Sequence, residues 1–432
     1  MSLLRQFRFL SKLDYSNGQK RPSCLYAATR KGVLFLKNIQ TGRSSRFTVG
    51  KRTYILYKSI QLVPNVHRCE RQLRLASRLA YYEFGVPSEV VKYESFEEPT
   101  IQKTEADQVI VRMLAAPIHP SHINTIQGTY PLRPKSFPAV GGAEGIGKVI
   151  AVGGSVKELK IGDLVYPGQL TTGTWATHIK EKESSFDKVT LKSQIKFEQE
   201  FKKGDGINFI AALSVLRINP GTALRMLNDF VPDMTKGDII IQNGANSAVG
   251  QAVIQLAKEM DLVTVNIIRD RENVEELKED LKRIGADYVW TESELRSAKE
   301  FRDNIIPKAK LALNCVGGSS STEISKCLGS RGVHVTYGGM SLKPVTAATS
   351  ALIFKDISFK GFWMSRWASE HAGTSELKDM YNHLESLLLS GKLSLPKHKM
   401  ISFDDQSAVC NALSQAIKGK TGGKFILDMR ST

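Results

Sequence analysis

From about residue 80 to residue 213, apolar positions fall in short runs that are separated by glycine-rich or polar turns. Residues 108–118 predict one strand, and residues 145–167 predict two strands around a turn at Gly153 and Gly154. Many short strands with few helices indicate a compact β-rich domain. We expect this domain to span residues 79–213.

Beyond residue 213 the hydrophobic pattern changes its period. Residues 238–260 predict a buried strand, a turn of small residues and a helix, and residues 262–270 predict a second strand. Further units of the same kind lie at 272–286, 287–290, 310–318 and 332–340. Strands that alternate with helices form a doubly wound parallel sheet. The predicted fold class is therefore α/β, with a Rossmann domain over residues 214–360.

The last segment, residues 361–432, predicts a helix over 376–393 and a closing strand over 422–429. The apolar runs of the chain stay shorter than the ~18–20 residues that span a bilayer. We therefore expect no integral membrane segment.

The basic residues are concentrated at the start of the chain. The formal net charge is +17, and residues 1–78 hold 17 of the 60 Lys and Arg residues but only two of the 43 acidic residues. On a helical wheel of the first turns, Leu4 and Phe7 fall on one side, and Arg5 and Arg8 fall on another. A basic, acid-poor amphipathic start is typical of a transit peptide. We expect residues 1–78 to be a basic presequence, with a disordered basic tail as the alternative.

The five cysteines are scattered, odd in number and without C-x-x-C spacing. This pattern fits a reducing compartment and argues against a zinc finger or a disulfide framework.

The turn after the first strand of the α/β domain is the candidate cofactor site. In a doubly wound sheet this turn binds a pyrophosphate, because glycines let the backbone approach and the helix N-terminus offers N–H groups. The turn here is "NGANSAVG", residues 243–250, which keeps only Gly244 and Gly250 of the usual glycines. By itself the pattern fits an ordinary turn between a strand and a helix equally well.

The end of the second strand indicates which dinucleotide binds. Sites for NAD carry an acid there, whereas sites for NADP carry a base near the 2′-phosphate. Here Arg269 and Arg271 flank Asp270 at this position, and arginine binds phosphate in a bidentate manner. We predict NADPH as the cofactor, and a solvated charged loop is the alternative interpretation.

Seven motifs, in order, carry a family resemblance over residues 80–432. They are "GTYP", "INPGTALRML", "NGANSAVGQAVIQLAK", "IIRDR", "YGGMS", "GFWMSRW" and "GGKFIL". Together they resemble the mitochondrial trans-2-enoyl-thioester reductases, the enoyl-acyl-carrier-protein/enoyl-CoA reductases of the medium-chain dehydrogenase/reductase superfamily. The resemblance implies that the β-rich domain is GroES-like and is completed by the C-terminal segment. It also implies NADPH-dependent reduction of enoyl thioesters in mitochondrial fatty acid synthesis.

The resemblance further implies a catalytic tyrosine. Tyr130 in "GTYP" matches the family's proton donor, although the local sequence by itself favours an ordinary turn residue. Zinc-dependent relatives carry a Gly-His-Glu motif, and here "GGAEG" has Ala143 in place of the histidine. We therefore expect no catalytic metal, unless His119, His122 and Glu144 converge on one. Without a metal, a positioned phenol can stabilise the enolate oxygen and supply the proton.

The remaining site residues are carried over from the family position by position. They are implied cofactor contacts or neighbours: Asn219, Asn246, Ser247, Ala248, Val249, Arg269, Asp270, Arg271, Tyr337, Gly338, Gly339, Met340, Phe362, Trp363, Met364 and Lys424. Core packing is the alternative for Phe362 and Trp363, and a solvated strand lysine is the alternative for Lys424.

The resemblance also implies partners and a location. We expect acyl-carrier-protein or coenzyme A thioesters as substrates, a homodimer, and the mitochondrial matrix as the compartment. One rival is an NADPH quinone or carbonyl reductase on the same scaffold. Another is a non-catalytic protein that binds RNA through its basic extension, but those bases lack the interleaved aromatic residues of a stacking surface. We therefore expect no nucleic-acid partner.

Overall fold

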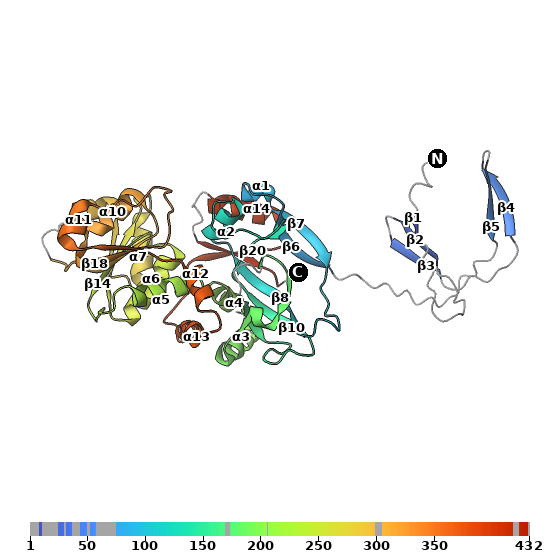
Figure 1. Cartoon of the computed structure of the whole chain (residues 1–432), viewed down its shortest axis with the longest axis horizontal. Helices are drawn as coiled ribbons and strands as arrows, with labels where there is room; N and C mark the ends of the chain where they lie inside the picture. The colour runs from blue at the N-terminus through green and yellow to red at the C-terminus, as the bar shows by residue number, and fades with distance from the viewer. Residues whose placement is uncertain are drawn as a thin grey trace. The chain divides into compact units, whose positions relative to one another are not determined.

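A computed structural model of the chain describes five short strands before residue 58, and then residues 75–168, 173–204, 206–298, 305–417 and 423–430 (Figure 1). The chain divides into two compact units, Met1–Gln72 and Leu73–Thr432. Each unit is described by itself.

In the first unit two small antiparallel sheets form. The strands are β1 (Arg8–Leu10), β2 (Leu25–Thr29), β3 (Gly32–Leu36), β4 (Ser44–Val49) and β5 (Arg52–Tyr57). β1 pairs with β2, so the prediction of a helix is wrong at Arg8–Leu10. A helix this short is marginal in water unless it packs on another surface, whereas a strand satisfies its backbone by pairing. The other residues of the predicted presequence helix lie outside the described residues.

The second unit begins with a β-rich lobe built on a seven-stranded sheet. In spatial order its strands are β13 (Phe186–Lys188), β11 (Leu164–Pro167), β10 (Ile146–Val152), β8 (Gln108–Pro117), β21 (Lys424–Asp428) and β20 (His398–Ser402), with β12 (His178–Lys182) also pairing with β8. A smaller sheet holds β7 (Lys92–Glu97), β6 (Leu75–Tyr81) and β9 (Ala139–Val140). Because β21 pairs with β8, the end of the chain returns to the sheet of this lobe.

Short helices surround this lobe. They are α1 (Pro87–Val90), α2 (Pro120–Ile126), the 3-10 helix η2 (Glu183–Ser185), α3 (Leu191–Lys203), α4 (Gly206–Ser214), α13 (Ser375–Leu389) and α14 (Gln406–Ile417). α3 begins where the Thr190 side chain accepts the N–H of Ser193, and it ends at Gly204 with a φ of 86°. A polar cap and a left-handed glycine are ordinary helix-end signals.

The second lobe is a six-stranded parallel sheet. Its strands, in spatial order, are β16 (Tyr288–Thr291), β15 (Val263–Ile268), β14 (Ile239–Asn243), β17 (Ala309–Asn314), β18 (Leu328–Thr336) and β19 (Ser358–Gly361). Every neighbouring pair is parallel. This order reverses between β14 and β17, which creates the switch point where ligands bind in such sheets. The predicted α/β class with a doubly wound sheet is confirmed.

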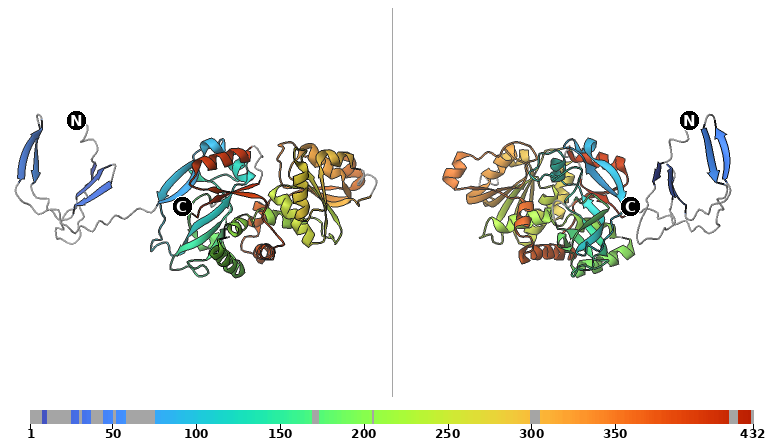
Figure 2. Two further views of the ribbon diagram at one scale, coloured as in Figure 1. Left: turned by 180° about the vertical axis from the view of Figure 1, so that it is seen from behind. Right: turned by 45° about the vertical axis from the view of Figure 1, so that its right-hand side comes forward.

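Helices lie on both faces of this sheet, as Figures 1 and 2 show. They are α5 (Asn219–Asp229), α6 (Ala248–Glu259), α7 (Val274–Arg283), α8 (Glu292–Ser297), α10 (Gly318–Lys326), α11 (Thr349–Lys355) and α12 (Met364–Glu370). The strand β14 reads "IIIQN" and is buried at every position, as expected for a strand covered on both faces.

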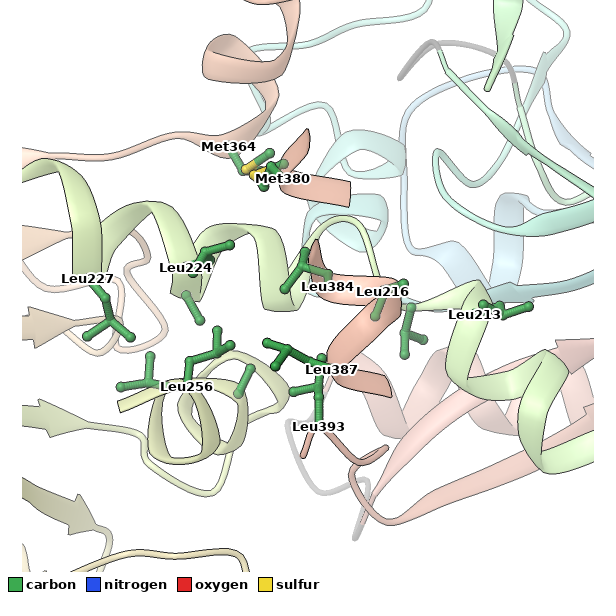
Figure 3. Packing of buried hydrophobic residues seen from close by; sticks show 14 of the residues in the cluster. Leu213, Leu216, Leu224, Leu227, Leu256, Met364, Met380, Leu384, Leu387 and Leu393 are labelled. Carbon is green, nitrogen blue, oxygen red and sulfur yellow. The ribbon is translucent and has the colours of Figure 1, made fainter. Parts of the chain in front are cut away.

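One hydrophobic core runs from the β-rich lobe into the α/β lobe. It joins Leu213 of α4 and Leu224 of α5 to Leu256 of α6 and Leu384 of α13 (Figure 3). Such continuous apolar packing resists relative movement of the lobes, since each buried leucine contributes about 1.5–3 kcal/mol. The site between the lobes therefore rests on a shared core.

Among the described residues, no single helix is long and apolar enough to cross a membrane. The bent pair α4 and α5 passes the same test jointly, at an angle of 50°. Most residues of these two helices are buried in the core.

Candidate active site

Tyr130 lies on the turn that follows α2. The carbonyl of Asn124 accepts the backbone N–H groups of Thr129 at 2.9 Å and Tyr130 at 3.2 Å, which holds the turn against the helix end. Gly128 has a φ of 74°, and a Cβ there would lie 2.9 Å from the Phe84 ring. Glycine is thus required both by the left-handed backbone and by the close aromatic neighbour. These constraints fix where the tyrosine side chain starts.

The Tyr130 hydroxyl meets a side chain from the far end of the chain. Trp363 Nε1 donates to the Tyr130 hydroxyl oxygen at 2.7 Å, and the two rings pack edge to face with centroids 5.9 Å apart. Burial raises the pKa of Tyr130 above its usual value, while the bonds from Trp363 and Ser365 act in the opposite direction. The phenol is therefore protonated at neutral pH, with a donor already directed at its oxygen.

The turn between β14 and α6 leaves no room for larger residues. Gly244 has a φ of 61°, and a Cβ there would lie 2.5 Å from Cys315 Sγ. At Gly250 a Cβ would lie 2.6 Å from the carbonyl oxygen of Ala245. Ser247 caps α6 by accepting the N–H of Gly250 at 3.0 Å. The close turn and the free N–H groups of the first helical turn, including Val249, fit a pyrophosphate.

Arg269 and Arg271 follow β15 directly, and both are exposed. Burial and the neighbouring Arg269 charge lower the pKa of Arg271, so the two guanidinium groups are close enough to repel each other. Neither has a carboxylate partner among the ion pairs of the described residues. Burial would raise the pKa of Asp270, but hydrogen bonds from Thr291 and Ser293 outweigh it and lower that pKa. Two adjacent unpaired cations beside a carboxylate engaged elsewhere fit a phosphate group.

Asn219 is the first residue of α5, only 7% exposed, and its Nδ2 has no partner among the described residues. A buried amide without a partner is costly, so the position fits a ligand acceptor. A small hollow of about 20 Å³ is lined by Asn219 and Ala248 among other residues, at the start of α5 and α6. Tyr130 is not among the residues that line it.

A buried polar chain lies behind α5. Glu144 Oε1 accepts the backbone N–H groups of Arg217 and Ile218, each at 2.8 Å. Its other oxygen lies 2.6 Å from His119 Nε2. On the far side of the imidazole, Lys424 Nζ lies 2.7 Å from His119 Nδ1. Lys424 therefore has a protein partner, and its role as a cofactor contact stays a prediction.

Burial has the largest effect on the pKa values of Glu144, Lys424 and His119. It raises the pKa of Glu144 to about 7 and lowers the pKa of Lys424 to about 7, and their mutual attraction opposes both shifts. Burial, together with the Lys424 charge, also lowers the pKa of His119 well below its usual value. The imidazole is therefore neutral between two groups of opposite charge.

The alternative metal site on His119, His122 and Glu144 can be compared with this geometry. His122 Nδ1 accepts the backbone N–H of His119 at 3.3 Å, so it does not turn toward Glu144 with that nitrogen. In the part of the chain that the structure describes, no three His, Cys, Asp or Glu side chains are grouped to hold a metal ion.

The remaining predicted residues fall into two groups. The segment after β18 packs on the loop after β17, since Tyr337 N donates to the Asn314 carbonyl at 2.9 Å and Met340 N to the Cys315 carbonyl at 2.9 Å. The sequence places Gly338 and Gly339 between these two anchors. Phe362 and Met364 pack against the shared core instead. For Phe362 this placement matches the core-packing alternative, and a contact of either residue with the cofactor stays a prediction. Asn246 lies at the cofactor turn, where its carbonyl accepts from Gln251 Nε2 at 3.0 Å.

Sequence reasoning did not anticipate two features. It named Trp363 only as a neighbour of the cofactor, whereas the indole N–H binds the Tyr130 hydroxyl. It also treated His119 and Glu144 only as possible metal ligands. The signal that could have found the second feature is Lys424, a lysine that directly precedes the apolar run "FIL" of the strand "KFILD".

Comparison with protein families gives two matches. Residues 105–190 match the alcohol dehydrogenase GroES-like domain, and residues 248–382 match the zinc-binding dehydrogenase family. The domain limits predicted from the sequence are not tested by these ranges and stay predictions.

Several curated relatives and solved structures are similar to this chain over most of its length. The enoyl-[acyl-carrier-protein] reductase, mitochondrial, of Mus musculus is 43% identical over 354 residues, which cover 81% of this chain and 88% of that protein. A solved structure of the Etr1p/NADP/crotonyl-CoA complex is 34% identical, with a TM-score of 0.72, over 82% of this chain and 100% of that chain. The mitochondrial 2-enoyl thioester reductase Etr1p/Etr2p heterodimer from Candida tropicalis is also 34% identical, with a TM-score of 0.73, over the same shares of both chains.

Proposed function

We propose a catalytic mechanism for this chain, which belongs to the mitochondrial enoyl-[acyl-carrier-protein] reductase family of the medium-chain dehydrogenase/reductase superfamily. The protein is an NADPH-dependent reductase of trans-2-enoyl thioesters in mitochondrial fatty acid synthesis. Tyr130 is the residue that stabilises the thioester oxygen and donates the proton. The observation that supports this role is the hydrogen bond from Trp363 Nε1 to the Tyr130 hydroxyl, 2.7 Å long.

The residues of the α/β lobe fit NADPH. Arg269 and Arg271 would hold the 2′-phosphate, because they form an unpaired cationic pair at the end of β15. Ser247 and Ala248 would hold the pyrophosphate at the start of α6. Asn219 would contact the nicotinamide with its unpartnered buried amide. When bound, NADPH supplies the hydride for the β-carbon of the substrate.

The chain's own contribution is electrostatic and acid–base. As the double bond is reduced, negative charge grows on the thioester oxygen, and a proton must reach the α-carbon. The Tyr130 hydroxyl can donate a hydrogen bond to that oxygen and then release its proton. Trp363 stabilises the resulting phenolate, since its Nε1–H already points at the phenol oxygen. A donor that is fixed in advance costs little reorganisation in the transition state.

The substrates are thioesters of coenzyme A or of acyl-carrier protein. A related structure contains crotonyl-CoA, and the name of the mouse relative specifies the acyl-carrier protein. Either substrate presents the same enoyl thioester to Tyr130, so the chemistry does not depend on the carrier.

We further propose that the chain forms a homodimer through the β19 edge of the α/β sheet. Among the strands that the structure describes, β19 pairs only with β18, so its other edge offers unpaired backbone groups. Beside it, α11 exposes Ile353 to 66% and Phe354 to 80%. Large exposed apolar side chains next to an open strand edge are typical of an interface.

A quinone or carbonyl reductase on the same scaffold is the second candidate. That chemistry would use the same cofactor residues but has no need for a proton donor at Tyr130. NADPH oxidation with crotonyl thioester should therefore exceed oxidation with a quinone. The reverse preference would favour the second candidate.

Tyr130→Phe tests the mechanism. This variant keeps the ring and removes the hydroxyl, so folding and NADPH affinity should be retained. Loss of one oxyanion donor and of the proton donor, which are a single group here, should lower kcat by about 10²–10⁴. If stopped-flow turnover of crotonyl thioester stays within about threefold of the wild-type rate, Tyr130 is not the acid.

A further inference from the structure

The buried chain Lys424–His119–Glu144 has a defined direction. When Lys424 is protonated, its ammonium has only donors, so His119 Nδ1 accepts from it. The imidazole proton then lies on Nε2 and is donated to Glu144 Oε2 at 2.6 Å. Lys424 thus fixes the tautomer of a histidine that sits between two oppositely charged groups. The three residues come from strand β21, from the start of α2 and from the segment before β10.

At one end of the Lys424–His119–Glu144 chain, Glu144 sets the position of α5. Glu144 Oε1 accepts the N–H groups of Arg217 and Ile218, the two residues immediately before α5. A carboxylate at this place is also favoured by the helix dipole. Glu144 is itself anchored, because Thr174 Oγ1 donates to its backbone carbonyl at 2.8 Å. The next residue is Asn219, with its unpartnered amide, so a shift of Glu144 would shift Asn219.

His119, in the middle of the Lys424–His119–Glu144 chain, sets the position of the Tyr130 turn. His119 is the residue before α2, and the carbonyl of Asn124 near the end of α2 holds Tyr130 N. The imidazole is therefore joined by one short helix to the tyrosine. Hydrogen bonds through Glu144, together with the short helix α2, therefore connect the residues next to Asn219 with the Tyr130 turn.

We propose that Lys424, His119 and Glu144 are positioning residues. They fix the position of the Tyr130 turn relative to Asn219. This inference rests on the proposed function, because it takes Tyr130 as the acid and Asn219 as the nicotinamide contact. It assigns to Lys424 a role through protein partners, distinct from a direct contact with the cofactor.

The energetics indicate that stability alone does not explain the three residues. A buried pair of opposite charges commonly contributes no more to stability than apolar residues of the same volume, because desolvation offsets the attraction. The Lys424–His119–Glu144 chain contributes more through the placement of the active-site residues than through stability. A misplacement of about 1 Å in an active site can cost 10²-fold in rate.

The first experiment compares kcat with KM in Glu144→Gln. This nearly isosteric change removes the charge and disturbs the hydrogen bonds to His119 and α5. We expect kcat for crotonyl-CoA to fall about 10–100-fold while KM changes less than about threefold. The matched control is Glu385→Gln. Glu385 is also buried and accepts the backbone N–H of Thr190 at 3.1 Å. Among the described residues it makes no hydrogen bond to Lys424, His119 or Glu144. An equal fall in kcat for the control would overturn the proposal.

The second experiment separates positioning from stability. Glu144→Gln alone leaves the buried Lys424 amine without the opposite charge that favours its protonated form, so the melting temperature of this variant should drop. Adding Lys424→Met removes the buried amine and should restore part of the melting temperature. If the residues position the site, kcat stays low in the double variant. If kcat recovers together with the melting temperature, the role is structural only and the proposal fails.

The third experiment distinguishes this inference from the mechanism on which it rests. Glu144→Gln is placed in the Tyr130→Phe background, where no acid remains to be positioned. We expect the further loss in kcat to be less than about threefold there, against 10–100-fold in the wild-type background. An equal loss in both backgrounds overturns the positioning role. The Tyr130→Phe variant alone reports whether Tyr130 is the acid, whatever the outcome for Glu144.

Discussion

At the scale of single residues, the local sequence leaves the role of Tyr130 open, and the side chains around it indicate that role. Taken alone, the motif "GTYP" favours an ordinary turn over an active site. The structure adds the indole of Trp363 from a segment 233 positions away. No local pattern could have predicted that hydrogen bond, because it depends on how two lobes meet. What the sequence does contain is the glycine that the turn requires, Gly128, and the tyrosine itself.

Trp363→Phe is expected to slow catalysis without affecting binding. The indole N–H stabilises the Tyr130 phenolate, and a hydrogen bond to a charged group contributes ~1.5–3 kcal/mol. Its loss should lower kcat roughly tenfold or more at neutral pH. Steady-state kinetics with crotonyl thioester checks the rate. A titration that follows the fluorescence of NADPH, and not that of tryptophan, checks the affinity.

Trp367→Phe is the matched control for that variant. Trp367 lies one helical turn further on, and its ring stacks on His371 and under Arg225. Among the described residues, no hydrogen bond joins Trp367 to Tyr130. This control should keep kcat near the wild-type value. A comparable loss in both variants would show that the Trp363 effect is not specific to the phenol.

At the scale of elements, the hydrophobic period predicted the parallel sheet well. The predicted strand over 262–270 is observed as β15 (Val263–Ile268), and the predicted helix over 376–393 is observed as α13 (Ser375–Leu389). The sequence did not predict α3 (Leu191–Lys203), because only four of its 13 residues are apolar. Two of these four are mostly on the surface, since Leu191 is 72% exposed and Phe201 is 57% exposed. A helix with few apolar residues gives a weak periodic signal.

The end of β15 carries the prediction about cofactor choice. Arg269→Ala combined with Arg271→Ala should weaken NADPH binding by two orders of magnitude or more, since each charge-assisted contact contributes ~1.5–3 kcal/mol. NADH lacks the 2′-phosphate and should bind with nearly unchanged affinity. Fluorescence titration with both cofactors measures the difference.

A surface arginine serves as the control for the double variant. Arg283→Ala removes an exposed guanidinium at the end of α7, where its partner is Asp280 at 2.9 Å. It should leave NADPH binding unchanged. Equal weakening of NADPH and NADH in the double variant would mean that Arg269 and Arg271 do not bind the 2′-phosphate.

At the scale of the whole molecule, buried histidines set the response to acid. Burial lowers the pKa of His334 to about 4, and burial also lowers the pKa of His119 and His122 well below the usual value of 6.5. Between pH 6.5 and 4 the unfolded chain binds more protons than the folded chain, so stability falls as the pH falls. His334 alone should contribute a loss of about 2 kcal/mol between pH 7.5 and pH 5.

Urea unfolding at these two pH values measures that loss. In His334→Gln the loss should be smaller than in wild type by about 2 kcal/mol, because no imidazole remains to be protonated at this site. His383→Gln replaces an exposed histidine and should keep the wild-type loss. If both variants lose as much stability as wild type, His334 does not contribute to the acid response.

Assembly is the last property that belongs to the whole molecule. If two copies meet at β19 and α11, charges placed there should separate them, because burying an unpaired carboxylate costs several kcal/mol. Ile353→Glu combined with Phe354→Glu should therefore sediment as a monomer at concentrations where the wild type sediments as a dimer. Phe201→Glu changes a similarly exposed aromatic residue on α3, in the other lobe, and should remain dimeric. Sedimentation velocity distinguishes the two species, and dissociation by Phe201→Glu instead would move the interface to the β-rich lobe. Since Phe354 lies far from Tyr130 along the chain and in the other lobe, a folded monomer would also show whether one copy alone can complete the active site.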